Sequence, residues 1–515
     1  MKQFAAMCIL MVLVTHIGIA QQQDLQPCGT VSHRSPWLKR YQQMPHQFRN
    51  GADTVLQVPL QVHLLANDNA TNANYFSMMR VLDALCRLNQ DFSGANIQFY
   101  LKGEPNKISS TAWNNHATVV EGAYMMFANN VDSAVNCYIV ADPAGNCGYN
   151  LPYAGVALAR NCTGATDHTW AHELGHAFSL PHPFLGWEGG VSWDNSVSHN
   201  FNDPAPTRVT YNYTNFKDSL ITDTLIIDTA WVELTDRSNC TFAADGFCDT
   251  WCDYLSYRWQ CNAVDTSIQV QTDPDGVTFH SDGSLFMSYA LDDCQDRFSG
   301  EQIAAMRANL YDEKPELLAN QNVPPIVSVE TPVLITPIDS TLVQYNNVVL
   351  QWEAVPNAVN YVVQVSRFSN FDLMDEYIVT TNEHTITNLL KDKYYYWRVR
   401  PFSSHSFCTT TSEKEKFKTA ELTSTSIPYA SLLFEVYPTV AVAEQALTIT
   451  IAADNTENTT LQVLDVSGRI LAEQKVVVAN AEQSTRYAIP NLPKGIYFLR
   501  CQTAKGMGVA KFVVQ

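Results

Sequence analysis

The sequence predicts an α+β domain followed by two all-β sandwich domains. At 515 residues the chain is longer than a single hydrophobic core usually supports, so several domains are expected. Helix-type and strand-type patterns alternate up to about Tyr311, whereas short β-type segments follow the proline-rich segment Asn320–Pro337. A content of 46% hydrophobic and 16% charged residues is typical of folded soluble protein.

The N-terminus has the features of a secretory signal peptide. Lys2 precedes a short apolar run, and the small residues Gly18 and Ala20 stand where a signal peptidase reads. We expect cleavage before Gln21 rather than a membrane anchor, because the run is short and a cleavage site follows it. No later stretch approaches the ~18 apolar residues of a membrane span, so the mature protein is predicted to have no transmembrane segment.

The net charge indicates which classes of partner the chain can bind, and the expected export indicates that its cysteines form disulfides. A formal net charge of −19 argues against nucleic-acid binding, which needs a basic surface, and is compatible with calcium sites. An oxidising compartment favours disulfides among the thirteen cysteines. Ten of the twelve beyond Cys8 lie between Cys28 and Cys294, while Cys408 and Cys501 stand alone in later segments.

Hydrophobic periodicity predicts the elements of the first domain. The apolar, partly alternating run Val55–Leu65 predicts a strand, and Pro59 places it near a sheet edge. Apolar residues at helical spacing within Asn74–Leu88 predict an amphipathic helix, with Cys86 as a buried thiol. Two further strands are expected at Ile97–Leu101 and Val135–Ala141.

The segment Thr166–Phe178, TDHTWAHELGHAF, predicts a helix that a Thr-Asp pair caps at its start. His172 and His176 point from the face opposite the apolar residues, one turn apart, so both imidazoles can bind one metal ion. Glu173 can accept a proton from water that zinc acidifies toward a pKa of roughly 7. This is the chemistry of peptide-bond hydrolysis, with Glu173 as general base.

A third histidine completes the predicted site for one catalytic zinc ion. Pro181 cannot continue the helix and disfavours the helical conformation of the residue before it, so the helix ends near Ser179 and His182 can reach the metal. The alternative is a surface helix with incidental histidines, which the spacing of the third one disfavours. His168, one turn before His172, is expected to be solvated rather than a ligand.

The segment HELGHAFSLPH, residues 172–182, resembles the extended metzincin motif, and LFMSY at Leu285–Tyr289 resembles the Met-turn of that clan. The resemblance implies a metzincin-like catalytic domain, in which Met287 lies beneath the imidazoles and Tyr289 can hydrogen-bond the oxyanion. Ser179 stands where the pattern has a glycine with positive φ, at a cost on the order of 1 kcal/mol. Similarity to the pappalysin, or cytophagalysin, family extends to Asp293-Cys294, Arg297-Phe298-Ser299, Gln302 and Met306.

The same family resemblance implies two further features of this domain. AADGFCDT at Ala243–Thr250 is similar to a loop near calcium, so Asp245 and Asp249 are possible Ca²⁺ ligands, a solvated turn being the alternative. The cysteines from Cys240 to Cys294 fall where such enzymes carry disulfides, and their irregular spacing disfavours zinc binding by these thiols.

Cys28-Gly29-Thr30 resembles the pro-segment of family zymogens, in which a thiolate occupies the open zinc position. A structural disulfide of Cys28 is the alternative. With Cys28 and Cys86 set aside, eight cysteines remain through Cys294, enough for four disulfides. Arg49-Asn50 is an accessible-looking place for removal of the segment.

The later segments predict strands of two sandwiches. Trp352 and the run YYYWRVRP at Tyr394–Pro401 resemble a fibronectin type III module, another sandwich being the alternative. The tail from Glu435 resembles the C-terminal sorting domain of bacterial type IX secretion. Strands are expected at Val348–Glu353, Tyr361–Ser366, Tyr394–Pro401, Leu447–Ile451, Thr460–Asp465, Gly495–Cys501 and Gly508–Val514.

These observations predict a secreted or cell-surface bacterial zinc endopeptidase, with protein or peptide substrates and with secretion machinery as a partner of its C-terminal domain. The rivals are an adhesive protein with an inactive catalytic domain and a zinc hydrolase of other substrates. The predicted organisation is signal peptide 1–20, pro-segment 21–52, catalytic domain 53–318, linker 319–331, fibronectin type III-like domain 332–418, linker 419–430 and sorting domain 431–515.

Overall fold

The computed structural model describes residues 25–30, 33–49, 51, 53–70, 75–188, 200–215, 224–420, 433–442, 446–452, 457–478, 483–503 and 506–515. The predicted signal peptide and most of the second predicted linker therefore lie outside the described residues. The chain forms two compact units. One comprises Met1–Thr341, Val349–Ile386 and Tyr394–Phe417, and the other comprises Leu342–Val348, Thr387–Lys393 and Lys418–Gln515.

A mixed sheet forms the centre of the first unit. Its strands are β1 (Leu56–Ala66), β2 (Ile97–Leu101), β3 (Asn106–Ser109), β5 (Val135–Val140), β7 (Gly148–Leu151) and β8 (Gly155–Ala159). The order is β2-β1-β5-β8-β7, and β3 pairs with the C-terminal part of β1. All neighbours are parallel except β7, which is antiparallel to β8 and forms one edge. The three strands predicted in this domain are thus confirmed, each to within about one residue.

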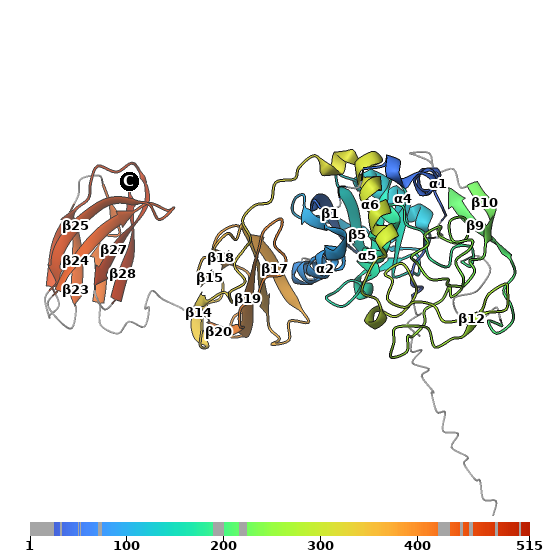
Figure 1. The fold of residues 1–515 in the computed structure, drawn as a ribbon. Helices are drawn as coiled ribbons and strands as arrows, with labels where there is room; N and C mark the ends of the chain where they lie inside the picture. Colours follow the sequence, from blue (N-terminus) through green and yellow to red (C-terminus); the bar gives the residue numbers. More distant parts are fainter. Residues whose placement is uncertain are drawn as a thin grey trace, which may run out of the picture. The chain divides into compact units, whose positions relative to one another are not determined.

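Helices cover both faces of this sheet, giving three layers (Figure 1). The helices of the first unit are α1 (Pro36–Gln43), α2 (Met78–Asp91), α3 (Thr111–Asn114), α4 (Val119–Asn129), α5 (Thr169–Ala177) and α6 (Gly300–Asp312). Apolar residues of α1, α2, α5 and α6 share one core with Leu56, Val58 and Leu60 of β1. Those of α4 pack on the opposite face with Leu65 and Tyr138. Short 3-10 turns occur at Pro45–Gln47, Ser93–Ala95, Arg160–Cys162, Asp292–Cys294 and Pro315–Leu318.

The prediction that Pro59 marks a sheet edge is wrong. β1 lies inside the sheet, between β2 and β5. The ladder with β5 begins only at Leu60, so Pro59 lies just before the stretch of β1 that is paired on both sides. A proline, which has no N–H, is tolerated at such a position. All eleven residues of β1 are buried, because both faces of the sheet are covered.

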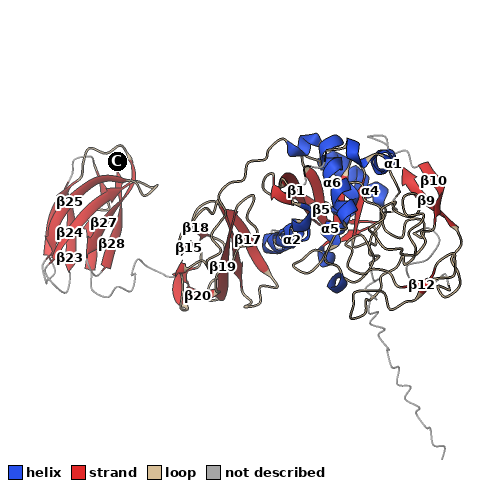
Figure 2. Cartoon of the chain, in the orientation of Figure 1, coloured by secondary structure: helices blue, strands red, loops and turns tan. Residues whose placement is uncertain are grey.

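The segment between α5 and α6 consists mainly of loops (Figure 2). It contains the antiparallel hairpin of β9 (Arg208–Asn215) and β10 (Thr224–Trp231), and the short pair of β11 (Gln271–Thr272) and β12 (Thr278–Phe279). A second short pair, β4 (Asn115–His116) with β6 (Asp142–Pro143), lies earlier in the chain. The loops are held by an aromatic core of their own, which includes Phe184, Trp187, Tyr254 and Tyr289.

Four disulfides are present among the described residues, and two sequence predictions about cysteines are wrong. Cys86 is not a buried thiol, because it is bonded to Cys408, 322 residues away. Eight cysteines from Cys137 to Cys294 do not form four disulfides, because Cys137 and Cys252 are free and buried. The other bonds join Cys147 to Cys162, Cys240 to Cys248 and Cys261 to Cys294, while Cys28 and Cys501 are also free.

The first sandwich contains two sheets. One consists of β13 (Leu334–Thr336), β15 (Val348–Trp352) and β18 (Glu383–Ile386). The other contains β16 (Asn360–Ser366), β17 (Met374–Val379) and β19 (Tyr394–Phe402), and β14 (Thr341–Gln344) and β20 (Glu415–Ala420) complete it. Trp352 and Trp397 are fully buried between the sheets, and the three predicted strands of this sandwich are confirmed.

The first sandwich is joined to the α/β part by more than the bond between Cys86 and Cys408. Glu376 of β17 accepts from the Ser77 hydroxyl at 2.8 Å and from the Met78 backbone N–H at 2.6 Å, so it caps the N-terminus of α2. The Arg400 guanidinium donates to Asp83 at 2.6 Å, on the next turn of α2. The α2 helix therefore has its N-terminal end satisfied by residues of the sandwich.

The second unit contains the second sandwich. Its strands are β21 (Leu433–Tyr437), β22 (Val440–Ala441), β23 (Ala446–Ala452), β24 (Glu457–Leu464), β25 (Ile470–Val478), β26 (Gln483–Ala488), β27 (Gly495–Thr503) and β28 (Gly506–Val514). They form sheets in the orders β21-β23-β26 and β22-β28-β27-β24-β25 around a separate core that includes Leu447, Leu461 and Leu499. The prediction of two all-β sandwich domains is confirmed. None of the helices in the described part of the chain is long and apolar enough to cross a membrane.

Candidate metal centre

The start of α5 differs from the prediction. Its N-cap residue is His168, whose backbone N–H donates to Asp292 Oδ1 at 3.0 Å and whose side chain makes no capping bond. The predicted cap by Thr166 and Asp167 is therefore wrong. A carboxylate more than a hundred residues downstream takes this role at the positive end of the helix.

The end of α5 follows the prediction. Phe178 is the C-cap, the Ser179 N–H donates to His176 O at 2.9 Å, and the Leu180 N–H donates to Gly175 O at 3.0 Å. This is a Schellman motif, which reverses the chain direction after the helix. Ser179 has φ +74°, the left-handed conformation expected where the metzincin pattern has glycine.

Ser179 offsets its backbone strain with a hydrogen bond, since its hydroxyl accepts from Asn309 Nδ2 at 3.0 Å. We expect Ser179→Gly to leave the free energy of unfolding nearly unchanged, because about 1 kcal/mol of strain and about 1 kcal/mol of hydrogen bonding are both removed. Ser179→Ala should lower it by about 1 kcal/mol, because only the bond is removed. Urea unfolding followed by tryptophan fluorescence measures both variants, and equal stability of the two would contradict this account.

Three imidazoles meet below the end of α5. His172 and His176 come from the helix and His182 comes from the turn that follows it. Their Nε2 atoms lie 3.2 Å apart for His172 and His176, 3.1 Å for His172 and His182, and 3.0 Å for His176 and His182. All three side chains are buried. The structure thus brings together the three histidines that the sequence singled out.

The donor set fits one zinc ion. Each Nδ1 is hydrogen-bonded to an oxygen acceptor, so in the neutral ring the proton lies on Nδ1 and the lone pair on Nε2. Three lone pairs that face one another repel unless a cation lies among them. Tetrahedral zinc with bonds of 2.0–2.1 Å separates two nitrogen ligands by about 3.3 Å, close to the distances here. The Nδ1 acceptors are Phe286 O at 2.7 Å, Leu180 O at 2.7 Å and Glu188 Oε1 at 3.0 Å for His172, His176 and His182 respectively.

Burial keeps these imidazoles neutral. Loss of solvation lowers the pKa of His172 to about 4 and holds the pKa values of His176 and His182 well below the ordinary value. The neutral imidazole is the form that binds a metal. The site is therefore ready to bind a cation at neutral pH without first releasing protons from its ligands.

Glu173 is fully buried beside the three imidazoles. Its Oε2 accepts from the Thr30 hydroxyl at 3.2 Å, and its Oε1 has no hydrogen-bond partner. Burial raises the pKa of Glu173 to about 8, against the opposing effect of the polar groups of Cys28 and Thr30. A dication nearby would favour the carboxylate form. A buried oxygen without a partner is rare in native proteins, and here it marks a place for a further donor.

Cys28 lies at the same point. Its Sγ is 3.7 Å from His176 Nε2, and its ligand atom and those of the three histidines all lie within 4.8 Å of one another. Tetrahedral zinc with a sulfur bond of about 2.3 Å separates sulfur from a nitrogen ligand by about 3.6 Å. Burial, followed by the charge of Glu173, raises the pKa of the Cys28 thiol well above its ordinary value. Cys28 is a free thiol, so the alternative of a structural disulfide does not apply.

The segment around Cys28 runs along the edge strand β7. The Gly29 N–H donates to Gly148 O at 2.8 Å. The Asn150 N–H donates to the Thr30 hydroxyl at 2.8 Å. These bonds to backbone groups of β7 occupy the open edge of the sheet, where another extended chain could otherwise add.

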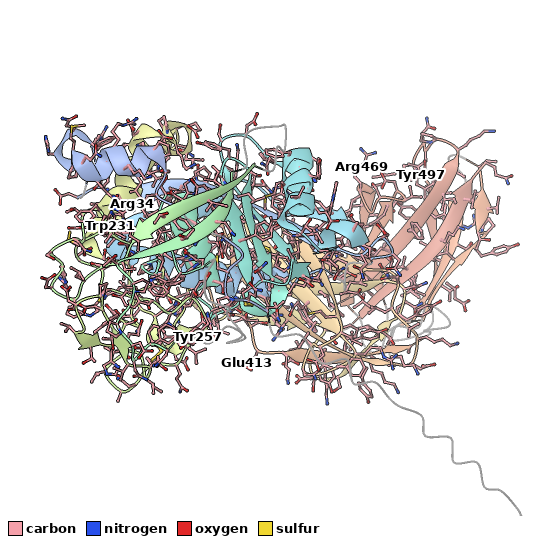
Figure 3. The ribbon with its side chains drawn as sticks, turned by 90° about the vertical axis from the view of Figure 1, so that its right-hand side faces the viewer. Arg34, Trp231, Tyr257, Glu413, Arg469 and Tyr497 are labelled. Atoms are coloured by element: carbon pink, nitrogen blue, oxygen red, sulfur yellow. A yellow bond between two sulfur atoms is a disulfide. The ribbon has the colours of Figure 1, made fainter. Side chains whose placement is uncertain are left out.

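Described residues of the predicted pro-segment beyond Thr30 pack on other parts of the first unit. Trp37 of α1 is buried and donates from its indole N–H to Asp312 at 2.7 Å. The His33 ring stacks on Tyr213 of β9 with centroids 4.3 Å apart. Arg34, labelled in Figure 3, donates to Thr241 O at 3.2 Å. Asn50 of the predicted maturation site lies outside the described residues.

Of the two predicted Met-turn residues, Tyr289 lies against the imidazoles and Met287 lies against α5, the helix that carries two of them. Met287 is fully buried, and a Cβ on Gly175 of α5 would lie 2.3 Å from its sulfur, so the helix approaches Met287 as closely as glycine allows. The Tyr289 ring lies 4.9 Å from that of His182, and its hydroxyl donates to Cys28 O at 3.3 Å. Burial raises the pKa of Tyr289 well above its ordinary value, so it remains a donor.

The prediction for His168 is wrong in one respect. His168 is buried rather than solvated, and its Nδ1 lies 2.9 Å from Asp91 Oδ2 of α2. It is not a member of the four-donor group. Helical periodicity places it one turn before His172, but the partner on another helix is not readable from the local sequence.

Asp245 and Asp249 have different surroundings. Asp245 is fully buried, its Oδ1 accepts from the Phe247 N–H and the Thr250 hydroxyl, and its Oδ2 has no partner. Burial raises its pKa to about 8. Asp249 accepts from the Ser299 hydroxyl at 2.6 Å and from a backbone N–H of the first turn of α6. Among the described residues the four-donor group is the one cluster of three or more such side chains, and neither aspartate belongs to it.

Sequence reasoning missed three residues that surround the metal centre. Asp292 caps α5, Thr30 donates to Glu173, and Glu188 accepts from His182. The sequence singles out Thr30 only as part of the Cys28 motif. No spacing rule indicates Asp292 or Glu188, because both residues lie in the loop-rich segment between α5 and α6 rather than in a long periodic element.

Comparison with known proteins identifies the C-terminal segment. Residues 435–515 match the family described as the secretion system C-terminal sorting domain. The predicted sorting domain is therefore confirmed, and with it the secretion machinery as a partner and a secreted or cell-surface bacterial location. No curated protein matches the chain.

Similarity to solved structures concerns fibronectin type III domains. The crystal structure of the FN1-FN3 domains of chicken CNTN1 has 15% identity over 36% of this chain and 67% of that chain, with a TM-score of 0.18. The solution structure of a fibronectin type III domain derived from human KIAA0970 protein has 23% identity over 19% of this chain and 75% of that chain, with a TM-score of 0.15.

Proposed function

We propose that the first unit is a latent zinc-dependent endopeptidase of the pappalysin-like metzincin type, exported through the C-terminal sorting domain. One observation carries the proposal: three neutral imidazoles present their Nε2 atoms to one another at 3.0–3.2 Å, with the buried Glu173 carboxylate beside them. Three histidines with one open position are the ligand set of a catalytic rather than a structural zinc site.

The residues have distinct roles in this proposal. His172, His176 and His182 hold the zinc ion, which when bound acidifies water and polarises a carbonyl. Glu173 takes the proton of the attacking water and returns it to the leaving amine. Tyr289 would donate a hydrogen bond from its hydroxyl, which now donates to Cys28 O, to the negatively charged oxygen of the tetrahedral intermediate.

Substrate binding follows from the place of the segment around Cys28. An extended peptide would pair with β7 through the backbone groups that Gly29 and Thr30 now use. The Cys28 thiolate would take the fourth zinc position and exclude water from it, so the chain would be inactive until the segment leaves. The segment buries Trp37, so its removal requires cleavage and separation from the core.

A calcium ion at Asp245 remains part of the proposal. The Oδ2 atom of this fully buried carboxylate lacks a partner, and an oxygen-ligated cation would satisfy it.

Metal analysis and a digest test the proposed function together. We expect the purified full-length protein to contain one zinc per chain, and the secreted processed form to hydrolyse casein until a chelator removes the zinc. After the chelator has been removed, transfer into zinc-free buffer should not restore hydrolysis, whereas addition of zinc should. N-terminal sequencing of the processed form identifies where the segment is removed.

Three results would decide against the proposal or for a rival. Absence of stoichiometric zinc would reject it. A zinc-loaded processed form that leaves casein, gelatin and peptide libraries intact would favour a hydrolase of other substrates or an adhesive protein. Hydrolysis that survives complete removal of the metal would reject the metal mechanism.

A further inference from the structure

The third histidine of the metal centre is supported differently from the other two. The Nδ1 atoms of His172 and His176 donate to backbone carbonyls, at 2.7 Å each. The Nδ1 atom of His182 donates instead to a carboxylate, Glu188 Oε1, at 3.0 Å. Both side chains of this pair are buried, with exposures of 0% for His182 and 6% for Glu188.

We propose that Glu188 is a positioning residue for the metal centre and acts through His182. Its carboxylate holds the Nδ1 proton of His182, which fixes the tautomer that presents Nε2 to the zinc ion. Its negative charge also favours a cation one imidazole away. The inference rests on the proposed function, because it concerns the affinity of the same site for zinc.

The geometry explains why the third ligand needs this support. His172 and His176 are held by the hydrogen-bonded backbone of α5, whereas His182 lies beyond the end of the helix. A ligand in a loop can rotate about χ1 and χ2 unless its ring is fixed at a second point. Stacking of the His182 ring on Phe184, at 4.5 Å, restrains the plane of the ring but does not select the tautomer. The carboxylate of Glu188 selects the tautomer, because it accepts the proton of His182 Nδ1.

Glu188 is itself held in place. Its Oε2 accepts from the Gly186 N–H at 2.8 Å. Gly186 has φ +103°, and a Cβ there would lie 2.6 Å from Val209 of β9, so this turn needs glycine and fits closely against the hairpin. The neighbouring Trp187 stacks on Tyr254 at 4.9 Å. The carboxylate is therefore fixed by both backbone and packing.

A second buried histidine–carboxylate pair provides a matched control. His168 Nδ1 lies 2.9 Å from Asp91 Oδ2, and both side chains are buried, but His168 is not in the four-donor group. Asp91→Asn removes the same kind of charge from the same kind of pair, one helical turn from His172. Asp91→Asn therefore shows how much zinc affinity is lost through lower stability of the fold alone.

The test measures zinc affinity of the full-length protein by competition with a chelator of known affinity. Glu188→Ala should weaken zinc binding about 10- to 100-fold, the usual effect of losing such a partner. Glu188→Gln keeps an acceptor oxygen and should recover part of the loss. Asp91→Asn should leave zinc affinity within about twofold while lowering the thermal midpoint of the metal-free protein. His182→Ala gives the loss expected when the ligand itself is absent.

The outcomes separate this inference from the function on which it rests. If the wild-type protein binds no zinc, the proposed function fails. If the wild type binds zinc and Glu188→Ala binds it equally well, the positioning role alone is rejected. Equal weakening by Glu188→Ala and Asp91→Asn would also reject it, because the effect would then follow from the fold. Weakening confined to the Glu188 variants supports it.

Discussion

Replacing Glu173 by alanine in the processed enzyme is expected to lower kcat for peptide hydrolysis by at least about 10³-fold, the upper range for loss of a general base. The carboxylate is fully buried beside the three imidazoles and has one oxygen without a partner. The four-donor group beside it consists of a cysteine and three histidines of the described residues and supplies no carboxylate of its own. The loss should appear in kcat more than in KM, because the proton transfer belongs to the chemical step.

Zinc content separates this effect from collapse of the site. Glu173→Ala should keep one zinc per chain, because the three imidazoles and their Nδ1 acceptors are unchanged. His172→Ala should lose both zinc and activity. Glu173→Gln preserves the size of the side chain and should be as inactive as the alanine variant. Turnover of Glu173→Ala within tenfold of wild type would remove Glu173 from the mechanism.

Replacing Cys28 by alanine is expected to make the full-length protein active before the N-terminal segment is removed. The thiol sulfur lies 3.7 Å from His176 Nε2 and completes the four-donor group. Even a contribution of about 1.4 kcal/mol from this ligand would shift the balance between closed and open site about tenfold. We therefore expect at least a tenfold rise in the rate of peptide hydrolysis by the uncleaved chain.

Another buried free cysteine is the control for Cys28. Cys137 accepts from the Trp170 indole in the core, away from the four-donor group. Cys137→Ala should reduce stability without releasing activity. Gel analysis must show that the Cys28→Ala chain stays uncleaved during the assay. If it stays inactive, the backbone pairing of Gly29 with Gly148, rather than the thiol, maintains latency.

Local sequence patterns predicted the centre of the candidate site well. Helical spacing put His172 and His176 on one face, and Pro181 required the chain to turn before His182. The left-handed conformation of Ser179 was also predicted. Each of these inferences depends on neighbours within about ten residues, where backbone geometry and sequence spacing are directly related.

Features that depend on distant partners were predicted poorly. The bond of Cys86 to Cys408 joins residues 322 positions apart. The pairing of His168 with Asp91, and the capping of α5 by Asp292, arise only when separate elements pack together. The position of Pro59 was predicted wrongly because strand order, and not composition, decides which strand is at an edge. None of these contacts has a spacing signature.

The bond between Cys86 and Cys408 also bears on how the protein can be dissected in the laboratory. A chain that stops at the proline-rich segment would leave Cys86 unpaired, the first N–H groups of α2 uncapped by Glu376, and Asp83 without Arg400. Truncation there would create a new odd thiol in an exported product and invite intermolecular crosslinking. The shortest truncated form that keeps these contacts and the last strand of the first sandwich therefore ends after Ala420.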